Sequence, residues 1–267
     1  MHLLDALSDP CPLLMGIVNA TPDSFADGGA YDPVAQGQRL AREGAAILDI
    51  GGESTRPGSA PVAPEEECAR VLPVIRALAR AAPLISVDTR HAATMAAALA
   101  SGANMVNDIR ALADTGAMEV LAARTDVLVC LMHMRGEPAT MQDAPAYADV
   151  VGEVCAFLGD RAAACEAAGI ARTRLILDPG IGFGKTVAHN LELLRSIDRL
   201  KGLGLPVLIG ASRKSLIAAL SSGEPPAQRL PGSLALALAA ARAGADVLRV
   251  HDVAATAQAL AVGRALA

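Results

Sequence analysis

Short apolar segments alternate with longer, alanine-rich amphipathic segments along the whole chain. The apolar segments have the length of buried strands. Eight of them can be counted, at residues 13–18, 47–50, 84–87, 105–106, 127–132, 175–177, 207–209 and 247–250. The amphipathic segments predict helices at residues 33–42, 64–81, 92–100, 115–124, 148–168, 190–203, 215–220 with 232–243, and 254–265. Strands that alternate with helices predict a parallel sheet.

The number of repeats and the chain length together favour a closed barrel. Eight strand–helix units in 267 residues suit an α/β fold of the (β/α)8 TIM-barrel type, with a single domain over residues 1–267. A doubly wound open sheet, which would need fewer strands, is the alternative. The chain is 52% hydrophobic but only 2% aromatic, so its core is predicted to be mainly aliphatic.

Three connections that follow predicted strands are unusually long, at residues 19–32, 51–63 and 133–147. Long loops in a compact domain are usually functional or mobile. In a barrel, loops that follow strands lie at the C-terminal face, where barrel enzymes keep their active sites. These three loops are therefore expected to border a site.

The stretch from residue 175 to residue 185 has the pattern of a ligand-binding turn. A short apolar strand ends at Asp178, and Pro179 cannot continue the hydrogen bonding of the strand. Three glycines then alternate with other residues up to Lys185, which lets the backbone approach a ligand closely. The stretch matches neither the phosphate-loop pattern nor the dinucleotide fingerprint, because Pro179 and Lys185 stand where those patterns need glycine. A plain strand-to-helix turn is the alternative.

Polar residues stand at or just beyond the end of every predicted strand. In chain order they are Asn19; Asp49 with the segment 53–56; Asp88; Asn107 and Asp108; His133; Asp178; Ser212, Arg213 and Lys214; and Arg249 with His251. Any one of them could be a helix cap or a turn former. Eight strand ends that all carry polar groups at one rim predict a polar site there.

The polar residues fall into two chemical groups. Carboxylate, amide and ammonium groups can together recognise the edge of a flat heterocycle such as a guanine or pterin ring, and they are offered by Asp88, Asn107, Asp178 and Lys214. The cationic group suits phosphate oxygens and consists of Arg56, Arg249, His251 and a further candidate, Arg213. Asn19 could help to hold a hydrated Mg²⁺. Adjacent heterocycle and phosphate subsites predict group transfer from a pyrophosphate ester.

Charge and composition exclude some partners and locations. A formal charge of −5 argues against a nucleic-acid partner held by bulk electrostatics. No apolar run has the length of a membrane span, and the N-terminus lacks the pattern of a signal peptide. Five scattered cysteines without a CxxC pair predict reduced, mostly buried thiols with no chemical role. A soluble cytoplasmic protein without a membrane partner is expected.

Eight sequence motifs resemble those of the dihydropteroate synthase family, in the family's order. They cover residues 15–29, 49–58, 86–89, 106–109, 131–138, 178–185, 210–214 and 249–251. The resemblance extends over nearly the whole chain, and the first two motifs are highly specific. Two positions depart from the family pattern, Ala20 and Ala26, and neither departure removes a group with an expected chemical role.

The resemblance implies a (β/α)8 enzyme of folate biosynthesis, a transferase that joins p-aminobenzoate to 6-hydroxymethyl-7,8-dihydropterin diphosphate. It implies a dissociative reaction assisted by Mg²⁺, small-molecule substrates, sulfonamides as inhibitors, and a homodimer. Loops 21–31 and 54–64 would close over the reaction. Asp88, Lys214 and Arg56 would be catalytic.

The resemblance also assigns residues to subsites. The pterin residues would be Asp88, Asn107, Met132, Asp178 and Lys214. The diphosphate residues would be Asn19, Arg56, Arg249 and His251, with Mg²⁺ near Asn19. The p-aminobenzoate residues would be Thr55, Pro57, Phe183, Ser212 and Lys214.

Two functions from other classes are alternatives. One is a methyltransferase that acts on methyltetrahydrofolate with a corrinoid partner, which would not need the segment 54–57 or the pair Arg249 and His251. The other is a non-catalytic pterin-binding paralogue, whose mark would be degenerate loops.

Three other polar segments have simpler interpretations. His133 is expected to support the site through a hydrogen bond, and Lys185 to orient the glycine loop. The glutamates at residues 65–67 are expected to form a solvated first helical turn.

Overall fold

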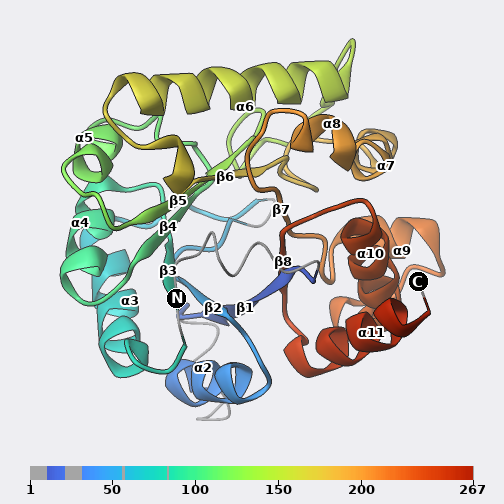
Figure 1. The fold of residues 1–267 in the computed structure, drawn as a ribbon, viewed down its shortest axis with the longest axis horizontal. Helices are drawn as coiled ribbons and strands as arrows, with labels where there is room; N and C mark the ends of the chain where they lie inside the picture. Colours follow the sequence, from blue (N-terminus) through green and yellow to red (C-terminus); the bar gives the residue numbers. More distant parts are fainter. Residues whose placement is uncertain (1–10, 22–31, 56–57, 83, 267) are drawn as a thin grey trace.

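A closed barrel of parallel strands forms the centre of the molecule (Figure 1). The computed structural model describes residues 11–21, 32–55, 58–82 and 84–266. In these residues eight strands form one sheet in the order β6-β5-β4-β3-β2-β1-β8-β7. Their bounds are β1 Leu13–Asn19, β2 Ile47–Gly51, β3 Leu84–Asp88, β4 Met105–Asp108, β5 Leu128–Met132, β6 Leu175–Asp178, β7 Leu208–Ile209 and β8 Val247–Val250.

The first and last strands of that order, β6 and β7, also meet. Leu177 of β6 forms a parallel bridge with Val207, and its backbone N–H donates a 2.8 Å hydrogen bond to the carbonyl of Pro206. This contact brings β6 beside β7 and closes the sheet. The predicted (β/α)8 barrel is therefore confirmed, and the alternative of an open, doubly wound sheet is wrong.

Helices follow the strands and surround the barrel (Figure 1). Their bounds are α2 Pro33–Arg42, α3 Pro64–Leu78, α4 Ala92–Ala100, α5 Ala117–Ala122, α6 Val150–Ala167, α7 Val187–Arg195, α8 Ile197–Lys201, α9 Ser215–Leu220, α10 Leu230–Arg242 and α11 Val253–Ala265. Short 3-10 turns lie at η2 Arg172–Arg174 and η3 Pro226–Gln228. None of the described helices is both long and apolar enough to cross a membrane.

The helical segment predicted at residues 190–203 differs in the structure. It begins earlier, because the Thr186 side chain accepts a hydrogen bond from His189 N–H, and the His189 ring accepts one from Thr186 N–H. This is a capping box in which histidine takes the usual place of glutamate or glutamine. The segment is also interrupted at Ser196, whose backbone leaves the helical region between α7 and α8.

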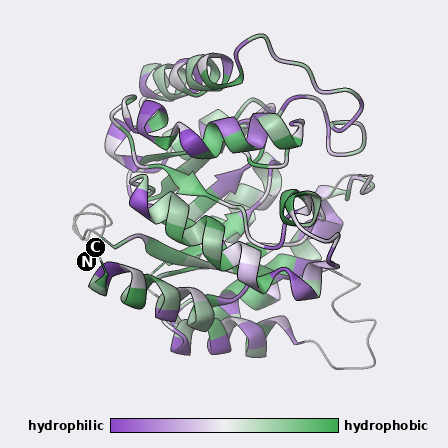
Figure 2. Cartoon of the chain, turned by 90° about the vertical axis from the view of Figure 1, so that its right-hand side faces the viewer, coloured by the Kyte–Doolittle hydropathy of each residue, from purple (hydrophilic) through white to green (hydrophobic). Residues whose placement is uncertain are grey.

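Two apolar cores lie on the two sides of the sheet. The larger core packs the outer face of the strands against the helices. The smaller core fills the inside of the barrel with Met15, Ile47, Met105, Cys130, Ile176, Leu208 and Val247. Figure 2 shows the central strands mainly in the colour of hydrophobic residues, whereas the helices contain both hydrophobic and hydrophilic residues.

The inner core determines where polar side chains enter the barrel. Residues two apart on a strand point to the same side of the sheet. Four strands therefore carry an apolar residue of the inner core followed, two positions later, by a polar residue that also points inward. The pairs are Ile47 and Asp49, Met105 and Asn107, Ile176 and Asp178, and Val247 and Arg249. A polar layer thus covers the apolar core on its C-terminal side.

All five cysteines lie in the described residues, and Cys68, Cys130, Cys155 and Cys165 are free thiols. Cys130 and Cys165 are buried, whereas Cys11, Cys68 and Cys155 are only partly buried. The four free thiols agree with the prediction of reduced cysteines, but the prediction that most of the five are buried is wrong.

Candidate functional site

Arg249 is the centre of the polar layer. Its Nε donates a 2.6 Å hydrogen bond to Asp49 Oδ2, and its Nη2 donates one of 2.7 Å to Asp88 Oδ2. Asn107 Nδ2 donates to the same oxygen of Asp49 at 3.1 Å. Four side chains from β2, β3, β4 and β8 are therefore joined inside the mouth of the barrel.

The charges of this network are set by burial and by their mutual contacts. Burial raises the pKa of Asp88 to about 7, although the charge of Arg249 opposes this rise. Burial alone would lower the pKa of Arg249, but Asp49 and Asp88 raise it above its ordinary value. Arg249 therefore remains a cation, and Asp88 changes its charge near neutral pH.

Asp178 and Lys214 form the second part of the layer, at the ends of β6 and β7. Asp178 is buried, and its Oδ1 accepts a 2.7 Å hydrogen bond from the backbone N–H of Gly180. Burial raises the pKa of Asp178, while nearby Lys214 opposes the rise. Burial lowers the pKa of Lys214 to about 8, against the attraction of Asp178. Lys214 also lies 4.5 Å from the ring centre of Phe183.

The glycine loop, residues 180–184, is held by side chains along its whole length. Every one of its five backbone carbonyls accepts a hydrogen bond from a side chain. The donors are Lys185 to Gly180 and Phe183, Lys214 to Ile181, Gln142 to Gly182, and Tyr147 to Gly184. The loop is therefore fixed from the β5 side, by Gln142 and Tyr147, and from the β7 side, by Lys214.

Lys185 is the main donor to the glycine loop. Its Nζ is buried and also contacts His133 Nδ1 at 2.9 Å. Burial lowers the pKa of Lys185 to about 7. The pKa of His133 is lowered to about 3, mainly by burial and secondly by the nearby charge of Lys185. The imidazole is therefore neutral at physiological pH. These contacts agree with the interpretation of Lys185 as a residue that orients the loop and of His133 as its hydrogen-bonding partner.

The end of β7 and the end of β8 meet through a serine and a histidine. Ser212 Oγ lies 3.0 Å from His251 Nδ1, which brings a predicted p-aminobenzoate residue beside a predicted diphosphate residue. Arg213, by contrast, pairs with Asp252 at 2.9 Å and 2.5 Å. Arg213 is therefore already paired with a carboxylate, as Arg249 is.

The other predicted site residues in the described part of the chain are Asn19, Met132 and Thr55. Asn19 ends β1 and lies in register with Gly51 of β2, and Met132 is buried at the end of β5. Thr55 is partly buried in the loop after β2. Arg56, Pro57 and nearly all of loop 21–31 lie outside the described residues.

The prediction of a solvated first turn at residues 65–67 is wrong for Glu67. This residue is fully buried, and its carboxylate accepts a 2.6 Å hydrogen bond from Thr89 Oγ1. Burial raises the pKa of Glu67. The helical periodicity of α3 explains the difference, because Glu67 shares the buried face with Val71, Val74 and Leu78.

Sequence reasoning also gave no role to Asp49, which the structure places in contact with Arg249 and Asn107. The sequence does contain a sign that Asp49 has polar partners. Asp49 stands inside the apolar strand β2, and a fully buried carboxylate requires polar partners.

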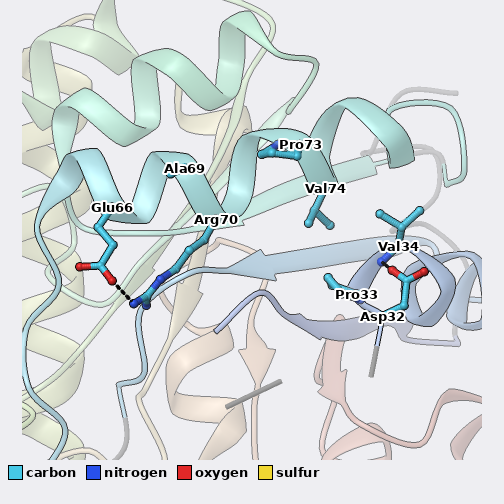
Figure 3. Close-up of a pocket in the computed structure, with 8 residues that line it drawn as sticks. All are labelled: Asp32, Pro33, Val34, Glu66, Ala69, Arg70, Pro73 and Val74. Atoms are coloured by element: carbon cyan, nitrogen blue, oxygen red, sulfur yellow. Dashed lines mark hydrogen bonds and ion pairs between the residues drawn. The ribbon is translucent and has the colours of Figure 1, made fainter. Parts of the chain in front are cut away.

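A surface hollow between α2 and α3 lies apart from this layer (Figure 3). Its lining includes the ion pair of Glu66 and Arg70, and it contains none of the predicted site residues. It faces outward from two helices of the outer ring, so it is not the candidate site.

Comparisons with known proteins agree on one family. A sequence model of the pterin binding enzyme family matches residues 15–251. The dihydropteroate synthase of Neisseria meningitidis serogroup B is 53% identical over 264 residues, which cover 96% of this chain and 93% of that protein.

Solved structures give the same result. The dihydropteroate synthase of Xanthomonas albilineans with 4-aminobenzoic acid has a TM-score of 0.91 and 52% identity, with 97% of this chain and 94% of that chain covered. A structure described as the enzyme from the same organism in complex with 7,8-dihydropteroate has a TM-score of 0.88 and 50% identity, with the same coverage.

Proposed function

Since the chain belongs to the pterin-binding enzyme family, and within it to the dihydropteroate synthases, we propose that it makes 7,8-dihydropteroate for folate biosynthesis. The substrates are 6-hydroxymethyl-7,8-dihydropterin diphosphate and p-aminobenzoate. The bond between the exocyclic methylene and the diphosphate oxygen breaks, and a bond from that carbon to the aryl amine forms. Pyrophosphate and one amine proton leave.

The polar layer above the inner core is the observation that carries this proposal. Asp88, Asn107 and Asp178 lie at or near the C-terminal ends of β3, β4 and β6 and offer acceptors toward the mouth of the barrel. Lys214 adds a donor beside Asp178. A flat ring with amine, amide and carbonyl groups on its edge matches this set, because each edge group finds a complementary partner. Met132 supplies an apolar neighbour for the ring face.

The diphosphate subsite is assigned to Arg249, His251, Asn19 and Arg56. Arg249 keeps its positive charge, and His251 lies two residues beyond it, just past the end of β8. Asn19 ends β1, which pairs with β8, so its amide oxygen belongs to the same part of the rim. Arg56, outside the described residues, completes the set through the resemblance of its motif.

The donor set fits Mg²⁺ bound mainly through the substrate. The described residues hold no group of three histidine, cysteine or acidic side chains suited to a metal ion. Mg²⁺ does not require such a group, because it keeps several waters and binds phosphate oxygens with one or two protein ligands. Asn19 would be the protein ligand. When bound, the ion would neutralise charge that develops on the departing pyrophosphate.

The subsite for p-aminobenzoate lies between the glycine loop and the end of β7. Lys214 lies over the ring of Phe183 there, and Ser212 precedes Lys214 by two residues on the same loop. Thr55 and Pro57 would complete it from the loop after β2. An apolar ring with a carboxylate suits a subsite that combines an aromatic side chain with nearby cations.

The protein groups favour loss of pyrophosphate before attack by the amine. Arg249 and His251 stabilise negative charge on the leaving group, while Asp88 stabilises the cation that remains on the pterin. The neutral aryl amine then attacks the methylene carbon. Closure of loops 21–31 and 54–64 would keep water from attacking in its place.

The test is the initial rate of pyrophosphate release with each component omitted in turn. The proposal predicts full release only with the dihydropterin diphosphate, p-aminobenzoate and Mg²⁺ together. Restoration by Mg²⁺ after treatment with a chelator would support the assigned metal dependence. Pterin binding without any release under all conditions would refute catalysis and favour a non-catalytic pterin-binding protein.

A further inference from the structure

Asp49 is a buried carboxylate to which the proposed reaction gives no direct role. It lies in β2 with no exposed surface, between the apolar residues Leu48 and Ile50. One of its oxygens, Oδ2, accepts from both Arg249 Nε and Asn107 Nδ2. Its other oxygen, Oδ1, has no hydrogen-bond partner in the part of the chain that the structure describes.

Stability alone gives a poor reason for this arrangement. A buried ion pair rarely stabilises a fold more than well-packed apolar residues of similar volume. Asp49 moreover leaves one oxygen without a partner among the described residues, and that costs free energy. A residue that is costly to the fold and that contacts two candidate ligand-binding side chains is better explained by what it does to those side chains.

Asp49 and Asp88 together set the orientation of the Arg249 guanidinium. Asp49 holds Nε and Asp88 holds Nη2, which together fix the guanidinium along one edge. Nη1 makes no hydrogen bond to any described residue, so its N–H groups, with the second N–H of Nη2, can serve a ligand. Without Asp49, the guanidinium would keep only its contact with Asp88 and could rotate about it.

The contacts also define how Asn107 is presented. Its Nδ2 is directed to Asp49, and its Oδ1 is buried without a partner among the described residues. The amide therefore offers its Oδ1 as an acceptor to whatever binds above it. A carboxylate can enforce this orientation, because it only accepts hydrogen bonds; an amide in its place could not.

We infer that Asp49 is a positioning residue that directs Arg249 toward the diphosphate and Asn107 Oδ1 toward the pterin edge, and so couples the two subsites through one oxygen atom. This inference rests on the proposed function, which assigns those subsites. Asp49 itself does not contact substrate.

The experiment measures affinity for two ligands, 6-hydroxymethylpterin and its diphosphate, by titration calorimetry. The ratio of the two dissociation constants gives the gain in affinity that the diphosphate provides. In Asp49→Asn, which conserves volume, this gain is expected to fall by about tenfold, because an oriented charge-assisted contact is lost. The affinity for the bare pterin should fall by a smaller factor, through Asn107.

A double-mutant cycle separates positioning from general damage. In an Arg249→Met background the guanidinium is absent, so adding Asp49→Asn should change the diphosphate gain by less than about twofold. Asp246→Asn is the matched control. Asp246 pairs with Lys201 at 2.7 Å just before β8, on the opposite face of the barrel, and its replacement should lower the melting temperature without changing the gain.

Two outcomes would overturn the inference alone: an unchanged gain in Asp49→Asn, or an equal loss in both backgrounds, with normal binding by the wild type. A wild-type protein that binds neither ligand would overturn the proposed function as well. If Asp49→Asn does not fold, the wild type still gives a test by ¹⁵N NMR of the arginine Nε–H groups. The Nε–H of Arg249, assigned with Arg249→Lys, should exchange slowly with water; exchange as fast as in solvent-exposed arginines would contradict the inference.

Discussion

Asp178 provides the clearest prediction at the scale of single residues. Its buried carboxylate can accept two parallel hydrogen bonds from a pterin edge, and an amide in its place can accept on one atom only. We expect Asp178→Asn to weaken binding of 6-hydroxymethylpterin by about 10-fold to 100-fold, measured by calorimetry. Asp160→Asn, at an exposed position of α6, should bind normally. Equal affinity of Asp178→Asn and the wild type would remove Asp178 from the pterin subsite.

The lowered pKa of Lys185 determines how this residue makes stability depend on pH. Its pKa is about 7 in the folded chain, below the ordinary value of 10.5. Between these values the unfolded chain binds the extra proton, so this group makes the free energy of unfolding rise as pH increases from 7 toward 10.5. The sign follows from burial, which disfavours the charged form.

The measurement is the melting temperature of the wild type and of Lys185→Met between pH 7 and pH 9. Lys185→Met loses the hydrogen bonds to the glycine loop and should melt lower throughout. The difference between the two proteins should widen toward pH 9, where the wild type gains stability. A constant difference would show that Lys185 keeps the same charge in the folded and unfolded chains.

Most site residues near strand ends could be predicted from the sequence, whereas the contacts of Asp49 and Glu67 could not. Asp88 and Asp178 stand where an apolar run stops, so the pattern alone reveals them. Asp49 and Glu67 interrupt a buried strand and a buried helical face, where their partners come from distant parts of the chain. The distance along the sequence between Asp49 and Arg249 hides their contact from any local pattern.

At the scale of elements, we expect glycine-to-alanine substitutions to lower the free energy of unfolding by amounts that depend on the space around the added Cβ. A Cβ at Gly180 would lie 1.9 Å from the carbonyl oxygen of His133, and its φ is +66°. Gly180→Ala therefore combines backbone strain with a clash and should lower the free energy of unfolding by about 2–5 kcal/mol. Gly44→Ala is the control, because its φ is +101° but nothing lies within 4 Å of the added Cβ.

Denaturant unfolding of both variants measures the difference. Gly44→Ala should lose only the strain component, about 1–2 kcal/mol. Similar losses in the two variants would mean that the loop can move away from His133, and the glycine loop would then be less firmly held than its five hydrogen bonds from side chains suggest.

The elements themselves were largely predictable, and their ends less so. All eight strands lie where the apolar segments place them, because a barrel strand buries both faces and leaves an unbroken apolar run. The helix expected at residues 190–203 was wrong at its start and in its continuity. Its start depends on a capping box with His189, and its break at Ser196 depends on packing that leaves no pattern in the sequence.

At the scale of the whole molecule, we propose a homodimer, as the resemblance implies. Among the described residues, the exposed large apolar side chains are Val187, Leu220, Val262 and Leu266. They belong to α7, α9 and α11 or its end, on the side of the barrel drawn at the right of Figure 1. Exposed apolar side chains on this side of the barrel are candidates for a dimer interface.

Light scattering after size-exclusion chromatography tests the dimer. The expected mass is twice the 27.1 kDa of one chain, and a double variant with Val187→Lys and Leu220→Lys should shift it toward that of one chain. A wild-type mass of one chain at micromolar concentration would contradict the proposal.

The most direct test of the whole account counts both products in one reaction. Purified protein with Mg²⁺, the dihydropterin diphosphate and p-aminobenzoate is quenched at intervals, pyrophosphate is measured enzymatically, and 7,8-dihydropteroate is measured by mass spectrometry. The account predicts equal amounts of the two products at every time point. Pyrophosphate without dihydropteroate would mean that water attacks the pterin carbon, and the chain would then act as a hydrolase and not as a synthase.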